Sequence, residues 1–446
     1  MIESIGEWQR THFSSDITPD MDNDTVILMG WVRAIRGGGK LKFIQLADKN
    51  GYIQITAKTD DITPELMEKI NELNREYVIG VKGTVKRNEQ APGGIEIVPQ
   101  TIKILNTSEA QLPMEVIQKK TPAELPTRLN TRFMDLRRPE IAAIFKIRDH
   151  VTTAIRLFLE SHDFIEINTP KLVAQATESG ANVFKVTYFD QEAYLAQSPQ
   201  FYKQTMMAAS FDRVYEISPV FRAEKHHTIR HVTEYTSLDF EMSFIRNSED
   251  VATMIEKLMV YIWHYVKTNA KEELKLLDKE INVPKTPFPR ISMREAYQLL
   301  KEADVPYKEG DDLDTNGEKE LGRLIREKFA HEFVFLTEFP WSVRPFYTMK
   351  KEDEPEWTAS FDMLCNGLEI VTGGQREHRH EILVKQAEEK KIDPKTLSFY
   401  MNMFKFGVPP HGGSGIGVDR IVMQMLDLGN IREAVLFPRE PDRLTP

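Results

Sequence analysis

The chain has 446 residues, too many for one ordinary hydrophobic core, so two or three domains are expected. It contains 41% hydrophobic and 28% charged residues, as globular proteins do, and its formal net charge of −10 means that any basic surface for nucleic acid must be local. The single cysteine, Cys365, excludes an intrachain disulfide and a cysteine-rich zinc site and fits a reducing cytoplasm. We expect no signal peptide and no membrane helix, because no run of about 18 apolar residues occurs.

Residues 1–106 are predicted to form a small β-barrel domain. Segments that alternate or run apolar indicate strands at residues 26–35, 41–47, 52–57, 77–85, 95–98 and 102–105. A helix is predicted over 63–73, with Thr63 as its N-cap and Pro64 in its first turn. This order of strands, helix and further strands is typical of an OB-fold, although other small β-barrels share it.

Residues 107–138 form a predicted connector rich in proline, threonine and arginine, and a larger domain is predicted over 139–446. Apolar residues at helical spacing indicate a long amphipathic helix over 141–161. A short strand follows at 164–168. A segment of about 245–345 has a mostly helical pattern and no evident chemistry.

Arginines, histidines and glutamates gather between Arg222 and Glu234, in a predicted turn between two antiparallel strands. Arg222 can bind an α-phosphate with its guanidinium fork, and Glu224 can accept a hydrogen bond from an adenine amino group. Arg230 and His231 lie on the returning loop, within reach of the β- and γ-phosphates. The pattern predicts a site where a carboxylate attacks a bound triphosphate, although a surface charge network on a hairpin is the alternative.

Two further clusters follow in the sequence. Glu369 lies on a predicted strand and suits Mg²⁺ beside phosphates, and a glycine pair brings Arg376 towards the same pocket. A glycine-rich stretch at 412–417 precedes a predicted helix, where Arg420 can stack on a purine or bind the γ-phosphate. The stretch is neither a Walker P-loop nor a dinucleotide fingerprint. The alternatives are a charged residue near a sheet end and a glycine turn that packs a C-terminal helix.

The combination and order of these clusters resemble the class II aminoacyl-tRNA synthetases of subclass b, and look most similar to their compact archaeal aspartyl type. The helix and strand before Pro170 resemble the first class motif, the segment around Arg222 the second, and the segment ending at Arg420 the third. The resemblance implies an α+β fold in which an N-terminal OB-fold barrel precedes a class II antiparallel sheet flanked by helices. It also implies a homodimer, ATP and L-aspartate as substrates, Mg²⁺ as cofactor and tRNA(Asp) as partner.

The resemblance assigns site residues by their position. Catalysis is implied for Arg222, Glu369 and Arg420. ATP binding is implied for Arg222, Ala223, Glu224, Arg230, His231, Val232, Glu369, Gly417, Val418, Asp419 and Arg420. Aspartate binding is implied for Glu178, Gln200, Lys203, Arg222, Asp239, Thr372, Arg376 and His411. Magnesium binding is implied for Glu369 and Thr372, where Thr372 stands at a position that is usually serine in the family.

The charges of the expected amino-acid pocket favour aspartate. Lys203 and Arg376 provide two cations for a side-chain carboxylate, and Arg376 can bind it as a fork. An asparagine pocket would leave the lysine facing an amide, and a lysine pocket would need an acid at that place.

The reaction that the resemblance implies has two steps. The aspartate α-carboxylate attacks the α-phosphorus of ATP, which forms aspartyl-adenylate and pyrophosphate, and the 3′-hydroxyl of the tRNA then attacks the adenylate carbonyl. Loops that carry Glu178 and His411 would close at the pocket, while Gln200 and Asp239 accept hydrogen bonds from the ammonium group. No side chain is an evident general base, so the phosphate can serve as one.

The barrel would bind the anticodon. Basic residues offered to tRNA phosphates are Arg33, Arg36, Lys40 and Lys42. Phe43 would stack on a base, unless it only packs in the core, and the resemblance assigns Gln54 and Glu96 to base edges. Arg33 and Pro92 stand where enzymes restricted to tRNA(Asp) tend to carry tryptophan and lysine. Because proline is associated with relaxed enzymes, we hypothesise that tRNA(Asn) is charged as well.

Two other protein classes stay open at this point. A synthetase-derived ligase, such as an asparagine synthetase, would use the same adenylate, but relatives of that sort usually lack the anticodon domain. A non-catalytic RNA-binding paralogue would be expected to have lost Arg222, Glu369 or Arg420, and all three are present.

Overall fold

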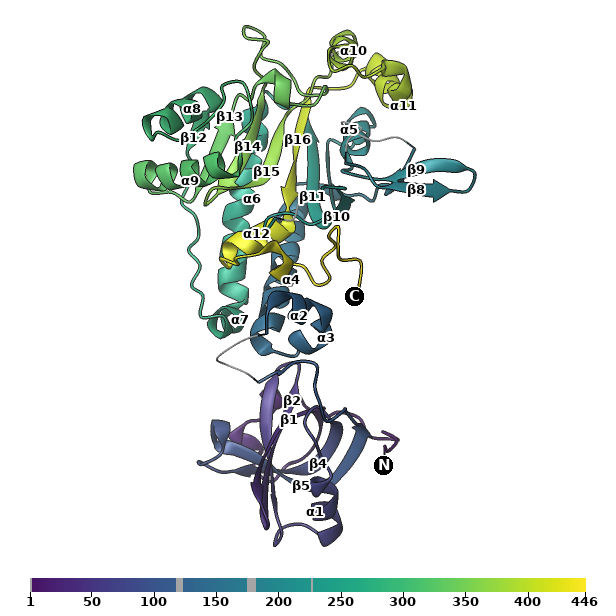
Figure 1. Cartoon of the computed structure of the whole chain (residues 1–446), viewed down its shortest axis with the longest axis vertical. Coiled ribbons are helices and arrows are strands. Elements are labelled where there is room, and N and C mark those ends of the chain that lie inside the picture. Colours follow the sequence, from purple (N-terminus) through teal and green to yellow (C-terminus); the bar gives the residue numbers. More distant parts are fainter. Residues whose placement is uncertain (1, 118–122, 175–181, 226–227) are drawn as a thin grey trace. The chain divides into compact units, whose positions relative to one another are not determined.

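The computed structural model describes residues 2–117, 123–174, 182–225 and 228–446. The chain divides into two compact units, Met1–Pro139 and Glu140–Pro446 (Figure 1). The finer division into a barrel over 1–106, a connector and a catalytic domain stays a prediction.

The first unit contains a closed barrel with the strand order β1-β2-β3-β5-β4. Its strands are β1 (Thr25–Gly38), β2 (Leu41–Asp48), β3 (Gly51–Lys58), β4 (Val78–Arg87) and β5 (Ile95–Asn106). Helix α1 (Pro64–Asn71) lies between β3 and β4, and the hydroxyl of Thr63 caps it by accepting from the Leu66 amide at 3.3 Å. This topology confirms the predicted OB-fold. Two short helices follow the barrel, α2 (Leu125–Asn130) and α3 (Arg132–Asp135).

One strand prediction for the barrel is wrong. Residues 95–98 and 102–105 belong to a single strand, β5, and not to two. The pairing register with β4 shifts between Lys82 and Gly83, which face Thr101 and Pro99 respectively. The extra residue between them is accommodated as a bulge, so the strand continues past a proline that cannot donate to the ladder.

The second unit is built on an eight-stranded sheet with the order β12-β13-β14-β15-β16-β11-β10-β6. Its strands are β6 (Ile165–Glu166), β10 (Arg213–Phe221), β11 (Glu234–Ser243), β12 (Arg290–Ser292), β13 (Phe333–Thr337), β14 (Ser360–Cys365), β15 (Leu368–Gln375) and β16 (His411–Gly417). All neighbours run antiparallel except the edge pairs β6 with β10 and β12 with β13. A smaller sheet holds β7 (Leu172–Val173), β9 (Gln191–Leu195) and β8 (Lys185–Tyr188). The predicted class II architecture is confirmed.

Helices surround this sheet. They are α4 (Pro139–Glu160), α5 (Gln200–Ala208), α6 (Ser248–Asn269), α7 (Lys271–Leu276), α8 (Met293–Glu302), α9 (Thr315–Phe329), α10 (His380–Glu389), α11 (Ser398–Met401) and α12 (Val418–Met425). The predicted long helix corresponds to α4. The segment of about 245–345 is mostly helical, as predicted, but also contributes the strands β12 and β13.

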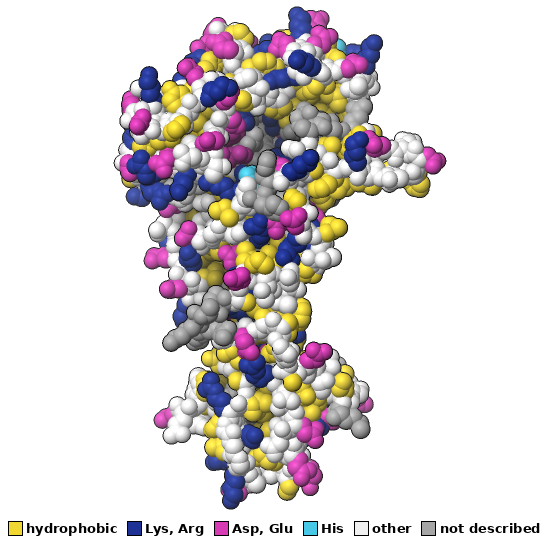
Figure 2. Space-filling view, viewed as in Figure 1, with side chains coloured by type: hydrophobic (Ala, Val, Ile, Leu, Met, Phe, Trp, Pro, Cys, Tyr) yellow, Lys and Arg dark blue, Asp and Glu magenta, His cyan; other side chains and the backbone are white. Residues whose placement is uncertain are grey.

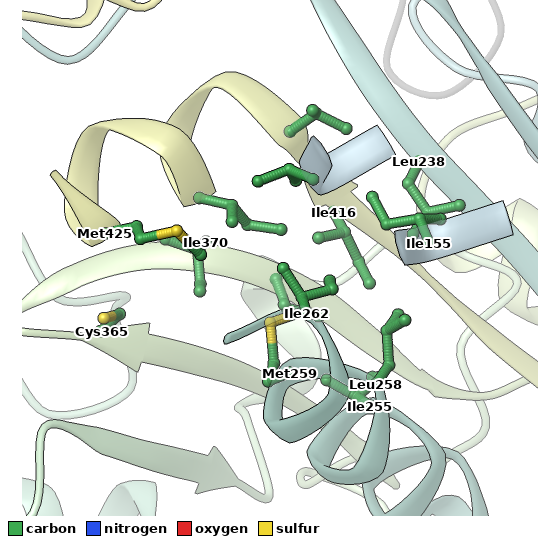
Figure 3. Packing of buried hydrophobic residues seen from close by; sticks show 14 of the residues in the cluster. Ile155, Leu238, Ile255, Leu258, Met259, Ile262, Cys365, Ile370, Ile416 and Met425 are labelled. Carbon is green, nitrogen blue, oxygen red and sulfur yellow. The ribbon is translucent and has the colours of Figure 1, made fainter. Parts of the chain in front are cut away.

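The main core of the second unit lies between α6 and the central strands. Ile255, Leu258 and Ile262 project from α6 towards Ile370 on β15 and Ile416 on β16, and all are buried (Figure 3). A helix with this stripe covers one face of a sheet because each buried side chain of this size contributes about 1.5–3 kcal/mol. The opposite face of β11, β15 and β16 is thereby left for polar side chains.

The glycine-rich stretch at 412–417 lies in the central strand β16 rather than in a turn. A Cβ atom at Gly413 would lie 2.1 Å from the Phe240 carbonyl oxygen and 2.3 Å from the Glu241 carboxylate. Glycine is therefore required here for the close approach of β11, and the approach brings the Glu241 side chain against the strand. The following helix, α12, begins at Val418, as the sequence predicts.

Candidate active site

A cavity of about 220 Å³ lies on the polar face formed by β11, β15 and β16. In the space-filling view this region of the molecule is hollowed, with acidic and basic side chains around it (Figure 2). The predicted residues that line the cavity are Gln200, Arg222, Glu224, Arg230, His231, Val232, Asp239, Glu369, Thr372, Arg376, Gly417, Asp419 and Arg420. Side chains from three separate sequence clusters are thus brought to one place. Glu178 lies outside the described residues.

Arg222, Glu369 and Arg420 form one end of the cavity. Arg222 follows the last residue of β10, and its guanidinium lies 5.7 Å from the Tyr235 ring centroid. Nη1 of Arg420, in the first turn of α12, donates to the Glu369 carbonyl oxygen at 2.6 Å and lies 3.9 Å from its carboxylate. The two arginines suit the triphosphate that the sequence predicts here, and the carboxylate suits the metal ion that accompanies it.

The surroundings of Glu369 favour the charged form of its carboxylate. Withdrawal from water would raise the pKa of its carboxyl group, but Arg420 and the Thr372 hydroxyl lower it more, with help from Arg222 and Arg344. The pKa of Glu369 therefore lies below its ordinary value. Thr372 donates to Glu369 Oε1 at 2.8 Å, so the predicted pair of oxygen ligands is in contact.

Asp362, which sequence reasoning did not single out, is a buried carboxylate next to Thr372 that does not itself line the cavity. It pairs directly with Thr372 across β14 and β15, and Arg344 Nη2 lies 2.8 Å from its Oδ2. Its buried Oδ1 forms no hydrogen bond with any residue that the structure describes. Burial raises the pKa of Asp362 to about 7, against the opposing charge of Arg344. An orphaned carboxylate oxygen beside Glu369 fits a hard cation such as Mg²⁺.

The loop between β10 and β11 carries Arg230 and His231 into the cavity. His231 Nδ1 lies 2.6 Å from the Thr228 hydroxyl, and burial together with the charge of Arg420 lowers the pKa of the His231 ring. The pKa of the His231 ring therefore lies below its ordinary value, which favours the neutral, hydrogen-bonding form of the ring. Arg230 donates to Glu318 Oε2 at 2.9 Å.

Glu318 comes from the segment that the sequence presents as chemically quiet. It lies in the first turn of α9, and Gly322, one helical turn later, packs so closely that a Cβ atom would lie 2.4 Å from the Gly367 amide nitrogen. This contact presses α9 against the turn before Glu369. Burial and the charge of Glu369 raise the pKa of Glu318 to about 8. The Gly322–Gly367 contact is long-range, so no local pattern could have revealed Glu318.

Three of the residues predicted to bind ATP make contacts inside the protein, and their contact with ATP stays a prediction. Asp419 is 2% exposed, and its carboxylate accepts from Arg148 Nε at 3.0 Å and from the Thr236 amide at 2.9 Å, which ties α12 to α4 and β11. Val418 is fully buried in the core. Ala223 does not line the cavity, and its amide donates to the Asn182 carbonyl oxygen at 2.8 Å.

Arg376 lies at the other end of the cavity. Its Nε donates to Glu241 Oε1 at 3.0 Å, and its Nη2 donates to the Gly413 carbonyl oxygen at 3.0 Å and to Gln200 Oε1 at 3.4 Å. Its Nη1 forms no hydrogen bond with any part of the chain that the structure describes. Arg376 thus presents a fixed, charged donor beside the acceptors of Gln200 and Asp239.

Lys203 does not occupy the place that the sequence predicts. It is 2% exposed and does not line the cavity. Its ammonium group donates to Asp239 Oδ1 and to the Ser414 carbonyl oxygen, both at 2.9 Å, and lies 3.6 Å from Glu241 Oε2. Two hydrogen bonds and the nearby Glu241 charge therefore hold the Lys203 ammonium among buried acids, away from the cavity lining.

His411 is likewise not at the pocket mouth. It begins β16, is fully buried and does not line the cavity. Burial lowers the pKa of its ring to about 4, although Glu241 opposes this shift. Direct contact between His411 and an amino acid is therefore not supported.

Of the residues predicted to contact tRNA, Phe43, Gln54 and Glu96 lie with Arg36 on one face of the barrel, whereas Lys42, next to Phe43 on β2, points to the opposite face. Arg36, Phe43 and Thr56 lie opposite one another across β1, β2 and β3, so their side chains share a face. Thr56 Oγ1 donates to Glu96 Oε2 at 2.5 Å, and Gln54 Nε2 lies 3.2 Å from the same oxygen.

Phe43 on this face is half-buried, and Pro92 is exposed at the turn before β5. The side chains of both residues are therefore accessible to a ligand of the barrel.

Arg33 is the extra residue of a β-bulge between Val32 and Ala34. Its side chain is 9% exposed and forms an ion pair with the buried Glu76, which Arg137 also contacts at 2.7 Å. A structural role for Arg33 is therefore better supported than the predicted tRNA contact.

Replacing Arg33 with methionine is expected to destabilise the barrel by about 2–3 kcal/mol, because Glu76 would lose one of its two buried partners. Hydrogen exchange of the amides in β1 and β4 measures this loss. Arg36→Met is the matched control, since Arg36 is exposed on the same strand, and it should change barrel stability by less than about 0.5 kcal/mol. Equal stability of the two variants would contradict the structural role of Arg33 and leave the predicted tRNA contact as its function.

The chain matches the family model described as tRNA synthetases class II (D, K and N) over residues 124–441. The chain belongs to this family. Residues 26–105 match the model of an OB-fold nucleic acid binding domain. This part of the synthetase is the closed barrel, and the larger match includes the cavity with its three motif clusters.

Individual relatives span the full length of this synthetase. It is 48% identical over 434 residues to the aspartate–tRNA(Asp/Asn) ligase of Methanopyrus kandleri, with 97% of this chain and 99% of the relative covered. It is 46% identical over 437 residues to the aspartate–tRNA(Asp) ligase of Pyrococcus abyssi, with 98% and 100% covered. The structure of asparaginyl-tRNA synthetase from Pyrococcus horikoshii with asparaginyl-adenylate matches with a TM-score of 0.91 at 31% identity, over 98% of this chain and 100% of that chain. The shared fold therefore does not distinguish the amino acid.

In the ranges that the structure describes, no helix combines the length and the apolar character that crossing a membrane would need.

Proposed function

We propose that this synthetase is an aspartate–tRNA ligase that activates L-aspartate with ATP and transfers it to the 3′ end of tRNA(Asp). The free Nη1 donor of Arg376 carries this proposal. A charged donor held by Glu241 and Gly413 suits a side-chain carboxylate, which forms a charge-assisted hydrogen bond, whereas the amide of asparagine offers only a neutral oxygen. Gln200 and Asp239 line the same end of the cavity and supply acceptors for the ammonium group.

The reaction depends on positioning and on charge. Arg222 and Arg420 bind the triphosphate and stabilise the charge that develops at the α-phosphorus when the aspartate carboxylate attacks. Neutral His231 and Arg230 would hold the outer phosphates. Since Arg230 is paired with Glu318, the triphosphate would have to share or displace this contact.

The residues present fit a magnesium ion. Glu369 and Thr372, which line the cavity, would hold it through oxygen atoms, with the Asp362 charge nearby. A set this small is typical of Mg²⁺, which keeps waters and takes further oxygens from the phosphates. Among the described residues, no cluster of three or more acidic, histidine or cysteine side chains forms a closed metal cage. When bound, the ion would neutralise charge on the phosphates during transfer.

The barrel would bind the anticodon of the tRNA. Arg36 and Phe43 supply a phosphate contact and a stacking surface, and Gln54 and Glu96 supply polar groups for base edges. The relatives include ligases named for tRNA(Asp) alone and for both tRNA(Asp) and tRNA(Asn). We propose that this enzyme charges both tRNAs, because the exposed Pro92 offers no charged group for discrimination.

A homodimer and a cytoplasmic place of action complete the proposal. Leu157 on α4 and Ile165 on β6 are 43% and 49% exposed, which supports a second copy packing on the first class motif. A sedimentation mass near twice 51.6 kDa is expected, and a mass near 51.6 kDa would contradict the dimer. The buried thiol of Cys365 is consistent with a reducing compartment.

Aminoacylation with radiolabelled aspartate tests the function, with two matched transcripts that differ only in the third anticodon base. Charging of both transcripts is expected. Charging of the aspartate transcript alone would leave a discriminating enzyme. Charging of neither, with aspartate-dependent pyrophosphate exchange intact, would indicate a ligase that acts on a small molecule, and the absence of exchange as well would overturn the proposal.

Replacing Pro92 with lysine is expected to lower kcat/KM for the asparagine transcript by about tenfold, since one base-edge contact is worth about 1–3 kcal/mol. The aspartate transcript should change by less than about twofold. Pro92→Ala serves as the control for the loss of the proline ring itself. Equal effects of lysine on both transcripts would show that Pro92 does not govern discrimination.

A further inference from the structure

Beside Arg376 a chain of buried amide and imidazole groups leads away from the cavity. His411 Nδ1 lies 2.8 Å from the Pro409 carbonyl oxygen, and His411 Nε2 lies 2.8 Å from Gln204 Nε2. Gln204 Oε1 accepts from Gln200 Nε2 at 2.9 Å. The side chains of His411 and Gln204 are fully buried, and Gln200 is 4% exposed.

The Pro409 carbonyl oxygen, at one end of this series of hydrogen bonds, determines which group donates in each of them. A carbonyl oxygen can only accept, so His411 must carry its proton on Nδ1, and the neutral ring leaves Nε2 as an acceptor. The low pKa of the His411 ring, about 4, agrees with a single proton at neutral pH. Gln204 must therefore turn its NH₂ group to His411 and its oxygen to Gln200.

The same logic sets the orientation of Gln200. Its NH₂ group faces Gln204 Oε1, so its own Oε1 points to the cavity side, where Arg376 Nη2 donates to it. Gln200 and Gln204 are four residues apart on α5 and share one face of the helix, which keeps their amides in line. A reversed amide would place N–H groups against the Arg376 donors.

We propose that His411 and Gln204 are positioning residues, which hold the Gln200 carboxamide oxygen towards the cavity as an acceptor for the ammonium group of the amino acid. The inference rests on the proposed function for the identity of the ligand. It assigns no contact between the ligand and either positioning residue. We call this series of hydrogen bonds, from the Pro409 carbonyl through His411 and Gln204 to Gln200, the relay. Its donors all face in the order that leaves the Gln200 oxygen for the substrate.

The variant Gln204→Glu tests the relay because it keeps the shape and the acceptor for Gln200 but removes the donor to His411. At pH 8.5 two lone pairs would face each other, and their repulsion would push the new carboxylate out of line with Gln200. The KM for aspartate in pyrophosphate exchange is therefore expected to rise by about tenfold, with the KM for ATP unchanged. The new carboxylate would also raise the pKa of His411 by more than about two units, because it favours the charged ring.

The expected pH dependence follows from that rise. Below its raised pKa, His411 gains a second proton and donates to the new carboxylate, so the KM for aspartate should fall by about threefold or more between pH 8.5 and 6. Other charged or titratable groups that face His411 are Glu241, Arg376 and His378. The wild type, which contains all of them, should change little over this range.

Tyr400→Phe is the matched control, because the Tyr400 hydroxyl also donates to Gln204 Oε1, at 2.9 Å, without setting the relay's direction. Its KM for aspartate should stay within about twofold of the wild type. An unchanged KM for aspartate in Gln204→Glu, or an equal pH-independent loss for ATP and aspartate, would overturn the proposal.

NMR titration of the His411 ring in both proteins, without substrate, tests the relay separately. A raised His411 pKa in Gln204→Glu is expected, and an unchanged pKa would overturn the relay. Absence of exchange in the wild type would instead overturn the proposed function.

Discussion

Replacement of Glu369 by glutamine is expected to lower the rate of aspartate-dependent pyrophosphate exchange by roughly 10³-fold, since a charge that stabilises the transition state would be lost. The backbone should be unaffected, because Arg420 donates to the Glu369 carbonyl oxygen at 2.6 Å and Thr372 can still donate to the amide oxygen. The Mg²⁺ concentration for half-maximal rate should also rise. Steady-state exchange with varied Mg²⁺ measures both effects.

Glu332→Gln is the control for the same change of charge, because Glu332 is exposed and does not line the cavity. It should keep exchange within about twofold of the wild type. If Glu369→Gln kept more than about a tenth of the wild-type rate, with an unchanged requirement for Mg²⁺, Glu369 would not be the anion that the phosphates need.

Arg376→Lys is expected to lower kcat/KM for aspartate by about 10²-fold and to leave the KM for ATP unchanged. Arginine binds Glu241, Gly413 and Gln200 through Nε and Nη2 and still presents Nη1 to the cavity. A lysine has one nitrogen and cannot serve the buried glutamate and a ligand in the same geometry. Exchange kinetics with aspartate and ATP varied separately give the two parameters.

Arg379→Lys controls for a general sensitivity to this substitution. Arg379 lies three residues along the chain, pairs with Glu377 at 2.9 Å and has a side chain that is 41% exposed. Its kcat/KM for aspartate should stay within about twofold of the wild type. Loss of ATP and aspartate binding to the same extent in Arg376→Lys would mean that Arg376 only supports the fold.

The sequence alone was sufficient wherever local chemistry carried the signal. The cap at Thr63, the apolar stripe of α4 and the polar turn after β10 are each determined by neighbours within a few residues, so pattern and spacing predict them. Arg222, Glu369, Arg376 and Arg420 could be named as site residues because each stands beside a strand end or a helix start, and the order of their motifs matches a family.

Only the tertiary structure decided which predicted side chains face the cavity. Lys203 and His411 carry suitable groups, but contacts with β11, β16 and α5 bury both and occupy their polar groups inside the protein. Arg33 pairs with the buried Glu76, a partner far along the chain that the pattern of β1 cannot anticipate.

Glu318 and Asp362 come to lie beside the cavity residues Arg230 and Thr372 through contacts between α9 and the turn before Glu369 and between β14 and β15. What the sequence by itself determined is the set of chemical groups and the elements that carry them. Burial and pairing in three dimensions determined which of those groups remain able to bind a substrate, because a donor satisfied inside the protein is no longer available outside it.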